Sequence, residues 1–204
     1  MAQALSKLVN FDEFIKWYPN NGIPYELHDG TIVEMAPPTG DREKVVAFIA
    51  CKITVEFDRM ELPYAIPKTA FVKPPEAESA YSPDVLLLNL DNLNNAPLWQ
   101  KTSTVSQGTS VSLVVEVVST NWRDDYYKKY ADYEQMGIAE YWIADYAALG
   151  GRNFIGNPKQ PTIFVCQLID GEYQMNDFRG NNSIVSPTFP QLNLTAQQIF
   201  DAAL

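Results

Sequence analysis

Residues 111–118 form an apolar segment of five valines, one leucine and one serine in which Glu116 is the one charged residue. A strand with one face in water alternates apolar and polar side chains, so this run predicts a strand buried on both faces. A charge in such a strand is unfavourable unless it is paired or binds a cation. Glu116 therefore predicts either an interior ion pair or a metal ligand.

Two longer segments have the spacing of amphipathic helices. The apolar residues of segment 41–60 recur every four positions, at Val45, Ile49, Ile53 and Phe57. This spacing predicts one apolar helix face. Residues 123–136 predict a second helix that ends at Gly137, because glycine is favoured just after a helix C-terminus. Shorter helices are predicted after Asn10 and near residues 195–203.

The remaining pattern predicts strands and turns. Asp-Gly pairs, a strong hairpin signal, separate two pairs of strand-like segments. Predicted strands are 24–34 (as a hairpin), 64–72, 83–88, 111–118, 140–146, 162–169 and 172–178. The polar stretch of about twenty residues after residue 88 predicts a surface excursion or disorder. This order predicts an α/β fold, with a mixed central sheet flanked by helices and an N-terminal hairpin.

Length and composition narrow the class of protein. A chain of 204 residues with 46% hydrophobic residues predicts one globular domain, residues 1–204. No apolar run approaches the roughly 20 residues of a membrane span, and no secretory signal is recognisable, so a cytoplasmic protein is predicted. Cys51 and Cys166 are expected to be reduced core thiols. The single histidine, His28, is expected at the surface and disfavours a histidine zinc site or a Ser/His/Asp triad.

The net charge of −10 bears on possible partners. Contacts to phosphate rest on Lys and Arg, so the acidic balance disfavours tight, extended binding to nucleic acid. The basic residues are also too scattered along the chain to predict a phosphate-binding track. An enzyme that contacts phosphate only through a metal ion remains compatible with this charge.

Acidic residues occur at matched positions of two predicted strands. Asp84 begins the strand 83–88 and Glu116 lies within the next one. If these strands are neighbours, both carboxylates can bind one hard cation, Mg²⁺ or Mn²⁺. Lys128 and Lys129 on the following helix could then orient a metal-bound water or stabilise negative charge. The alternatives are a turn role for Asp84, an ion pair between Glu116 and Lys129, and solvated lysines.

Four segments together resemble the Uma-two family of predicted bacterial endonucleases, a branch of the restriction-endonuclease-like PD-(D/E)XK superfamily. They are YELHDGTIVEM, PDVLLL, LVVEVVS and KKYADYEQMGIAEYWIAD, and the resemblance covers roughly residues 10 to 190. It implies a restriction-endonuclease-like fold and hydrolysis of phosphodiester bonds in nucleic acid, with DNA as the expected substrate. It also implies Mg²⁺ (or Mn²⁺) as cofactor and a homodimer.

The resemblance assigns roles to individual positions. It implies that Asp84 and Glu116 bind the metal and that Glu26, in YEL, is a further ligand or base. The lysine that usually lies two residues after the glutamate is absent, because that position is Val118. The resemblance places the role of this lysine on Lys129, ahead of Lys128. For Glu26, an exposed charge in the hairpin is an equal alternative.

One departure from the family pattern affects the expected activity. Many members have a histidine at the start of the long helix, where this chain has Asp41, Arg42 and Glu43. Together with the net acidity, this absence leaves a second hypothesis, a weak or inactive nuclease fold that serves as a binding or regulatory module. A third hypothesis is a metal-dependent hydrolase of small phosphoesters.

Overall fold

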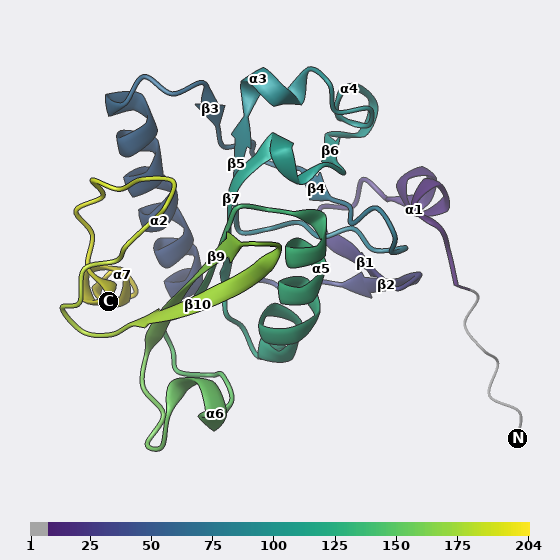
Figure 1. Ribbon diagram of the computed structural model, residues 1–204. Coiled ribbons are helices and arrows are strands. Elements are labelled where there is room, and N and C mark those ends of the chain that lie inside the picture. The colour runs from purple at the N-terminus through teal and green to yellow at the C-terminus, as the bar shows by residue number, and fades with distance from the viewer. Residues whose placement is uncertain (1–7) are drawn as a thin grey trace, which may run out of the picture.

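The computed structural model describes residues 8–204, and its centre is a six-stranded mixed sheet with the order β10-β9-β8-β7-β5-β3 (Figure 1). The strands are β3 (Tyr64–Ala65), β5 (Val85–Asn89), β7 (Val111–Val117), β8 (Glu140–Asp145), β9 (Thr162–Ile169) and β10 (Glu172–Phe178). β7 and β8 are parallel, and the other neighbouring pairs are antiparallel. The predicted mixed sheet is confirmed.

Two small sheets accompany the central one. The predicted N-terminal hairpin consists of β1 (Tyr25–His28) and β2 (Thr31–Glu34). Its turn residues Asp29 and Gly30 both have positive φ, which explains the Asp-Gly sequence. The second small sheet pairs β4 (Phe71–Val72) with β6 (Thr104–Val105) in parallel.

Helices cover both faces of the central sheet (Figure 1). The long helix α2 (Gly40–Arg59) and the last helix α7 (Ala196–Asp201) pack on one face, and α5 (Lys129–Met136) packs on the other. A π-helical segment, η2 (Asp124–Lys128), leads into α5. The shorter helices are α1 (Phe11–Trp17), α3 (Leu90–Leu93), α4 (Trp99–Thr102), η1 (Gly108–Ser110) and α6 (Arg152–Ile155).

Strand β7 is buried on both faces, as its apolar run predicts. Successive side chains of a strand point to opposite faces, so its residues fall into two sets. Leu113 and Val115 belong to the core that contains the apolar stripe of α2. Val114 and Val118 belong to the core that contains Tyr133 of α5. Glu116 has the same parity as this second set and therefore faces α5.

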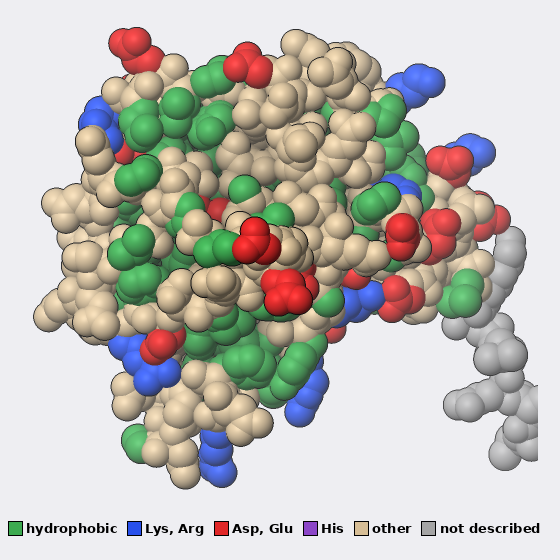
Figure 2. Space-filling model, viewed as in Figure 1, with side chains coloured by type: hydrophobic (Ala, Val, Ile, Leu, Met, Phe, Trp, Pro, Cys, Tyr) green, Lys and Arg blue, Asp and Glu red, His purple; other side chains and the backbone are tan. Residues whose placement is uncertain are grey.

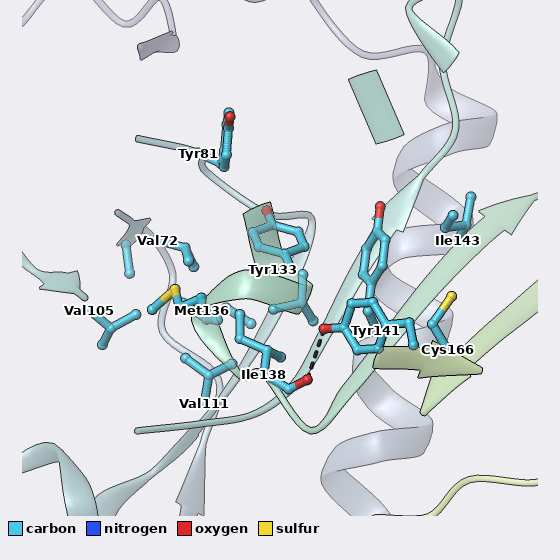
Figure 3. Close-up of a cluster of buried hydrophobic side chains, with 14 of the residues drawn as sticks. Val72, Tyr81, Val105, Val111, Tyr133, Met136, Ile138, Tyr141, Ile143 and Cys166 are labelled. Atoms are coloured by element: carbon cyan, nitrogen blue, oxygen red, sulfur yellow. Dashed lines mark hydrogen bonds between the residues drawn. The ribbon is translucent and has the colours of Figure 1, made fainter. Parts of the chain in front are cut away.

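Aromatic packing fixes α5 on the sheet. The ring of Tyr133 lies between Tyr81 and Tyr141, with centroid distances of 5.9 Å and 5.1 Å and near-perpendicular planes (Figure 3). Edge-to-face pairs of this kind are favourable beyond the area that they bury. Tyr141 belongs to β8 and Tyr81 to the segment before β5. The helix that carries Lys129 is thus held against two elements distant in sequence.

Some predictions from the pattern need correction. The strand predicted at 64–72 is interrupted at Pro67 and forms only β3 and β4, because proline cannot donate to a strand ladder. The polar stretch after β5 is an ordered excursion with several short elements. Cys166 is buried as expected, but Cys51 is exposed, because it lies off the apolar stripe of α2. No helix among the described residues is long and apolar enough to cross a membrane.

Candidate active site

The strand register brings Asp84 and Glu116 together. β5 and β7 pair in antiparallel fashion with Val85 opposite Val115, so continuing the register by one residue places Asp84 opposite Glu116. Directly opposed residues have side chains on the same face, with Cβ atoms about 5 Å apart. The backbone N–H of Val117 donates a 2.7 Å hydrogen bond to Asp84 Oδ2, which fixes this carboxylate at the N-terminal end of β5. The prediction that the two strands are neighbours is confirmed.

Lys129 lies at the centre of a cluster of carboxyl groups. Its Nζ atom is 3.1 Å from Glu116 Oε1, 3.4 Å from Glu26 Oε1 and 3.7 Å from Asp125 Oδ1. The lysine is only 4% exposed, and the three acidic residues are also buried. The four residues identified from sequence therefore converge from separate elements: Glu26 from β1, Asp84 from the position before β5, Glu116 from β7 and Lys129 from α5.

The pKa values of both Glu116 and Lys129 are raised, the first by burial and the second by neighbouring charges. Burial raises the pKa of Glu116 well above its usual range, more than the neighbouring Lys129 lowers it. Burial alone would lower the pKa of Lys129, but Glu116, Glu26 and Asp125 together raise it well above its usual value. Lys129 is therefore the permanently charged member, and the carboxylates share its single positive charge.

A tyrosine hydroxyl orients the carboxylate of Glu116 through a hydrogen bond. The hydroxyl of Tyr133 donates a 2.8 Å hydrogen bond to Glu116 Oε1, the same oxygen that contacts Lys129. Both residues are buried, so this donor is not replaceable by solvent. Glu116 Oε2 and Asp84 Oδ1 accept no hydrogen bond within residues 8–204. Each of these two carboxylates keeps one oxygen that can bind a cation.

Glu26 is a buried member of the site, so the alternative of an exposed hairpin charge is wrong. It is 1% exposed and accepts a 2.9 Å hydrogen bond from the backbone N–H of Ser82 at Oε1. His28 Nε2 lies 2.8 Å from Glu26 Oε2, and the histidine side chain is only 13% exposed. The expectation that His28 lies at the surface is therefore wrong. Side chains at alternate positions of β1 share a face, which places His28 beside the site.

Arg42 completes the arrangement, although sequence patterns gave it no role. Its guanidinium donates a 2.7 Å hydrogen bond to Asp84 Oδ2 and a 3.0 Å hydrogen bond to the carbonyl of Val117. It reaches the site from the first turn of α2, whose N-terminus is capped by Thr39. The available signal was its position at the start of the long helix, where the family pattern suggested a histidine.

Asp125 is the second residue of the site to which the sequence gave no role, although its spacing from Lys129, Tyr133 and Gly137 resembles the family pattern. It lies four residues before Lys129 within η2, and π-helical segments often occur at functional sites. Burial raises the pKa of Asp125 to about 7, against the opposing effect of Lys129. The carbonyl of Asp125 accepts a hydrogen bond from Tyr141, which ties η2 to β8. The spacing from Lys129 was visible, but the π-helical turn was not.

The charge of the cluster is compatible with a divalent cation. Four carboxyl groups face two permanent cations, Arg42 and Lys129, so the ionised cluster carries about two negative charges in excess. Within residues 8–204, however, no set of three or more His, Cys, Asp and Glu side chains is arranged to bind a metal ion. Mg²⁺ commonly uses only one or two carboxylates plus water and substrate phosphate. The Asp84–Glu116 pair fits that smaller requirement.

The space at the site is small. Glu26, Arg42, Glu116, Asp125 and Lys129 line a cavity of about 20 Å³. A volume of this size admits about one water molecule or ion, but no part of a substrate. Any larger ligand must therefore contact the cluster from outside.

The mixed sheet with helices on both faces has the restriction-endonuclease-like architecture that the family resemblance predicts. A solved structure described as a putative nuclease belonging to DUF820, from Anabaena variabilis ATCC 29413, superposes with a TM-score of 0.72. The alignment covers 96% of this chain and 99% of that chain, at 14% sequence identity. At this identity the similarity establishes the fold alone. No curated protein is similar enough to match.

The family follows from the sequence itself. Residues 11–197 match the Uma2 family model, which is described as a putative restriction endonuclease. Because the match covers most of the chain, the protein belongs to the Uma2 family. The family resemblance predicted from the sequence motifs is thereby confirmed.

Proposed function

We propose that this protein is a divalent-metal-dependent endonuclease that hydrolyses phosphodiester bonds in nucleic acid, with DNA as the expected substrate. The observation that carries the proposal is the buried cluster of Glu26, Glu116 and Asp125 around Lys129, with Asp84 opposite Glu116. A structural ion pair needs one carboxylate for each cation, whereas this cluster has more acidic groups than cations. Membership of the Uma2 family supports the same conclusion.

Asp84 and Glu116 would hold Mg²⁺ or Mn²⁺, which would supply charge neutralisation at the scissile phosphate and a water of lowered pKa. The ammonium of Lys129 is positioned to orient the attacking water or to stabilise negative charge that develops on the phosphate. Glu26 holds Lys129 through its Oε1 atom and is the candidate to accept a proton from the water. Tyr133 keeps Glu116 in place.

The direct test is nicking of supercoiled plasmid DNA in the presence of Mg²⁺ or Mn²⁺, with the substitutions Asp84→Asn and Lys129→Met. Both are expected to lower the nicking rate by about a hundredfold or more, since Asp84→Asn removes a negative charge that would hold the metal and Lys129→Met removes the positive charge that would lie beside the reacting phosphate. Undiminished cleavage by both variants would assign the activity to a contaminant and refute the proposal.

Matched controls separate the chemistry from folding. Lys128→Met removes the neighbouring lysine, which pairs with Asp29 and lies outside the Lys129 cluster. Asp91→Asn neutralises an exposed aspartate of α3. Both controls should retain the wild-type nicking rate. Circular dichroism and thermal unfolding of each variant establish that the loss does not reflect an unfolded protein.

Two observations favour the alternative of an inactive binding or regulatory module. Arg42 and Lys129 already neutralise part of the acidic charge, and the cavity beside them is very small. Isothermal titration with Mg²⁺ and Mn²⁺ distinguishes the hypotheses, because a module without a metal site would show no binding at about millimolar metal. Homodimerisation and a cytoplasmic location remain predictions; sedimentation velocity would test the first.

A further inference from the structure

A second, larger pocket adjoins the acidic cluster. It has a volume of about 330 Å³ and is enclosed by three segments: Met35–Thr39 before α2, Val118–Asn121 after β7, and the loop after β8 with Tyr146 and Leu149. Because β7 and β8 are parallel, their carboxyl ends meet at this edge of the sheet. Ligands of α/β sheets bind preferentially beyond the carboxyl ends of the strands. The position of the pocket is therefore typical of a ligand site.

The pocket is continuous with the candidate active site. Met35, Arg42, Ser119 and Asn121 line both this pocket and the small acidic cavity. Arg42 is the important link, because its guanidinium contacts Asp84 and its side chain borders the larger pocket. A ligand in the pocket would therefore have one end beside Arg42 and the candidate catalytic groups.

The chemistry of the lining indicates the kind of ligand. Arg42 is the one charged residue that lines the pocket, in a protein with a net charge of −10. Pro38, Val118 and Leu149 provide apolar surface, and Tyr146 and Asn121 provide an aromatic ring and an amide. A nucleobase needs flat apolar or aromatic surface for its faces and hydrogen-bonding groups for its edge. The volume lies within the range of small-molecule sites and leaves room for a base with its sugar.

The surface charge argues for recognition through one nucleotide. Lys and Arg side chains are scattered over the face in Figure 2 and form no continuous track there. Binding along a duplex requires several phosphate contacts from such residues. The whole chain carries 15 Lys and Arg residues against 25 Asp and Glu residues, so positive charge for such contacts is scarce, and a base bound beside the acidic cluster would supply affinity from another source. A paired base is stacked within the duplex and unavailable, so the nucleotide must be unpaired.

We propose that this pocket binds the base of a single unpaired nucleotide, whose phosphate lies at Arg42 and the acidic cluster. The inference rests on the proposed function, since it specifies the substrate of that site as single-stranded or locally unpaired nucleic acid. It extends the function by assigning base recognition to the loops after β7 and β8 and to the segment before α2.

The test measures binding in the absence of metal, by isothermal titration of the whole protein with the four 2′-deoxynucleoside 5′-monophosphates. At least one should bind about tenfold more tightly than 2-deoxyribose 5-phosphate, which lacks the base. Thr120→Trp places a large side chain at the pocket without touching the small cavity, and should weaken nucleotide binding by about tenfold. Thr54→Trp introduces the same side chain on exposed α2 surface and should leave binding unchanged.

Three results would overturn the inference: no nucleotide binding up to about 10 mM, equal binding of the sugar phosphate, or full binding by Thr120→Trp. Equal binding of the sugar phosphate would mean that Arg42 captures only the phosphate. The nucleotide-binding test and the nicking test can fail independently of each other. Plasmid nicking without nucleotide binding would contradict the base pocket alone, whereas base-dependent binding without metal-dependent nicking would contradict the nuclease alone.

Discussion

At the scale of single residues, the site depends on groups that form hydrogen bonds with the carboxylates of Asp84 and Glu116. Tyr133 and the backbone N–H of Val117 hold Glu116 and Asp84 in place, while Arg42 neutralises part of the charge of Asp84. Supporting hydrogen bonds of this kind set both the direction of a ligand oxygen and its affinity for a cation. Their removal should therefore affect catalysis more than folding.

Tyr133→Phe tests this role of the tyrosine hydroxyl. The ring and its packing against Tyr81 and Tyr141 are kept, but Glu116 Oε1 loses its 2.8 Å donor. We expect the nicking rate to fall about tenfold and the metal concentration for half-maximal rate to rise, as is typical for partners of metal ligands. The measurement is the nicking rate as a function of Mg²⁺ concentration.

Tyr130→Phe is the matched control, because its hydroxyl donates to the carbonyl of Tyr173 and not to the cluster. It should show the wild-type metal dependence. An equal loss in both variants would indicate a general packing effect and would remove Tyr133 from the support of Glu116.

At the scale of secondary-structure elements, the position of α5 determines the position of Lys129. Gly108, at the start of η1, lies against the C-terminal end of this helix. A Cβ atom at residue 108 would come within 2.3 Å of the carbonyl oxygen of Met136 and 2.7 Å of Gly137 C. Both contacts are with backbone, which cannot turn aside as a side chain can.

Gly108→Ala should therefore displace the end of α5 and lower the free energy of unfolding by about 2 kcal/mol, in the range of overpacked cores. Urea unfolding followed by circular dichroism measures the change. Gly40→Ala is the control, since a Cβ at the first residue of α2 meets nothing within 4 Å. A stability of Gly108→Ala equal to that of the control would show that η1 can move away freely.

The elements themselves were largely predictable from the sequence, and the site only in part. The apolar stripe of α2, the doubly buried run of β7 and the Asp-Gly turns are local signals, so each was identified. The convergence of Glu26 with Lys129 depends on contacts about a hundred residues apart in the chain, and the family resemblance suggested it where spacing could not. Arg42 was missed because only the folded chain brings it to Asp84. Asp125 and His28 are close in sequence to Lys129 and Glu26, but nothing in the local pattern shows that these pairs are buried together.

At the scale of the whole molecule, the acidic cluster opposes folding when no cation neutralises it. Burial raises the pKa of Asp84 and of Glu116 above their ordinary values, even though Arg42 and Lys129 act in the opposite direction. The folded protein then holds protons that the unfolded chain releases. Gathering these carboxyl groups in the interior therefore lowers stability at any pH where the unfolded chain has released those protons.

The raised pKa of Asp125 sets the pH range over which this loss of stability is expected. Its pKa is raised from 3.8 to about 7 by burial, so between these values the folded state retains a proton that the unfolded state has lost. The stability that this group contributes is complete below the lower value and is lost as the pH rises through the upper one. In metal-free buffer, the free energy of unfolding should therefore decrease from pH 4 to pH 7, and Asp125→Asn should flatten the decrease. Urea unfolding across this pH range measures the free energy, and Asp58→Asn, at an exposed position, is the control. If Asp125→Asn keeps the wild-type pH profile, the proton responsible is bound by a group other than Asp125.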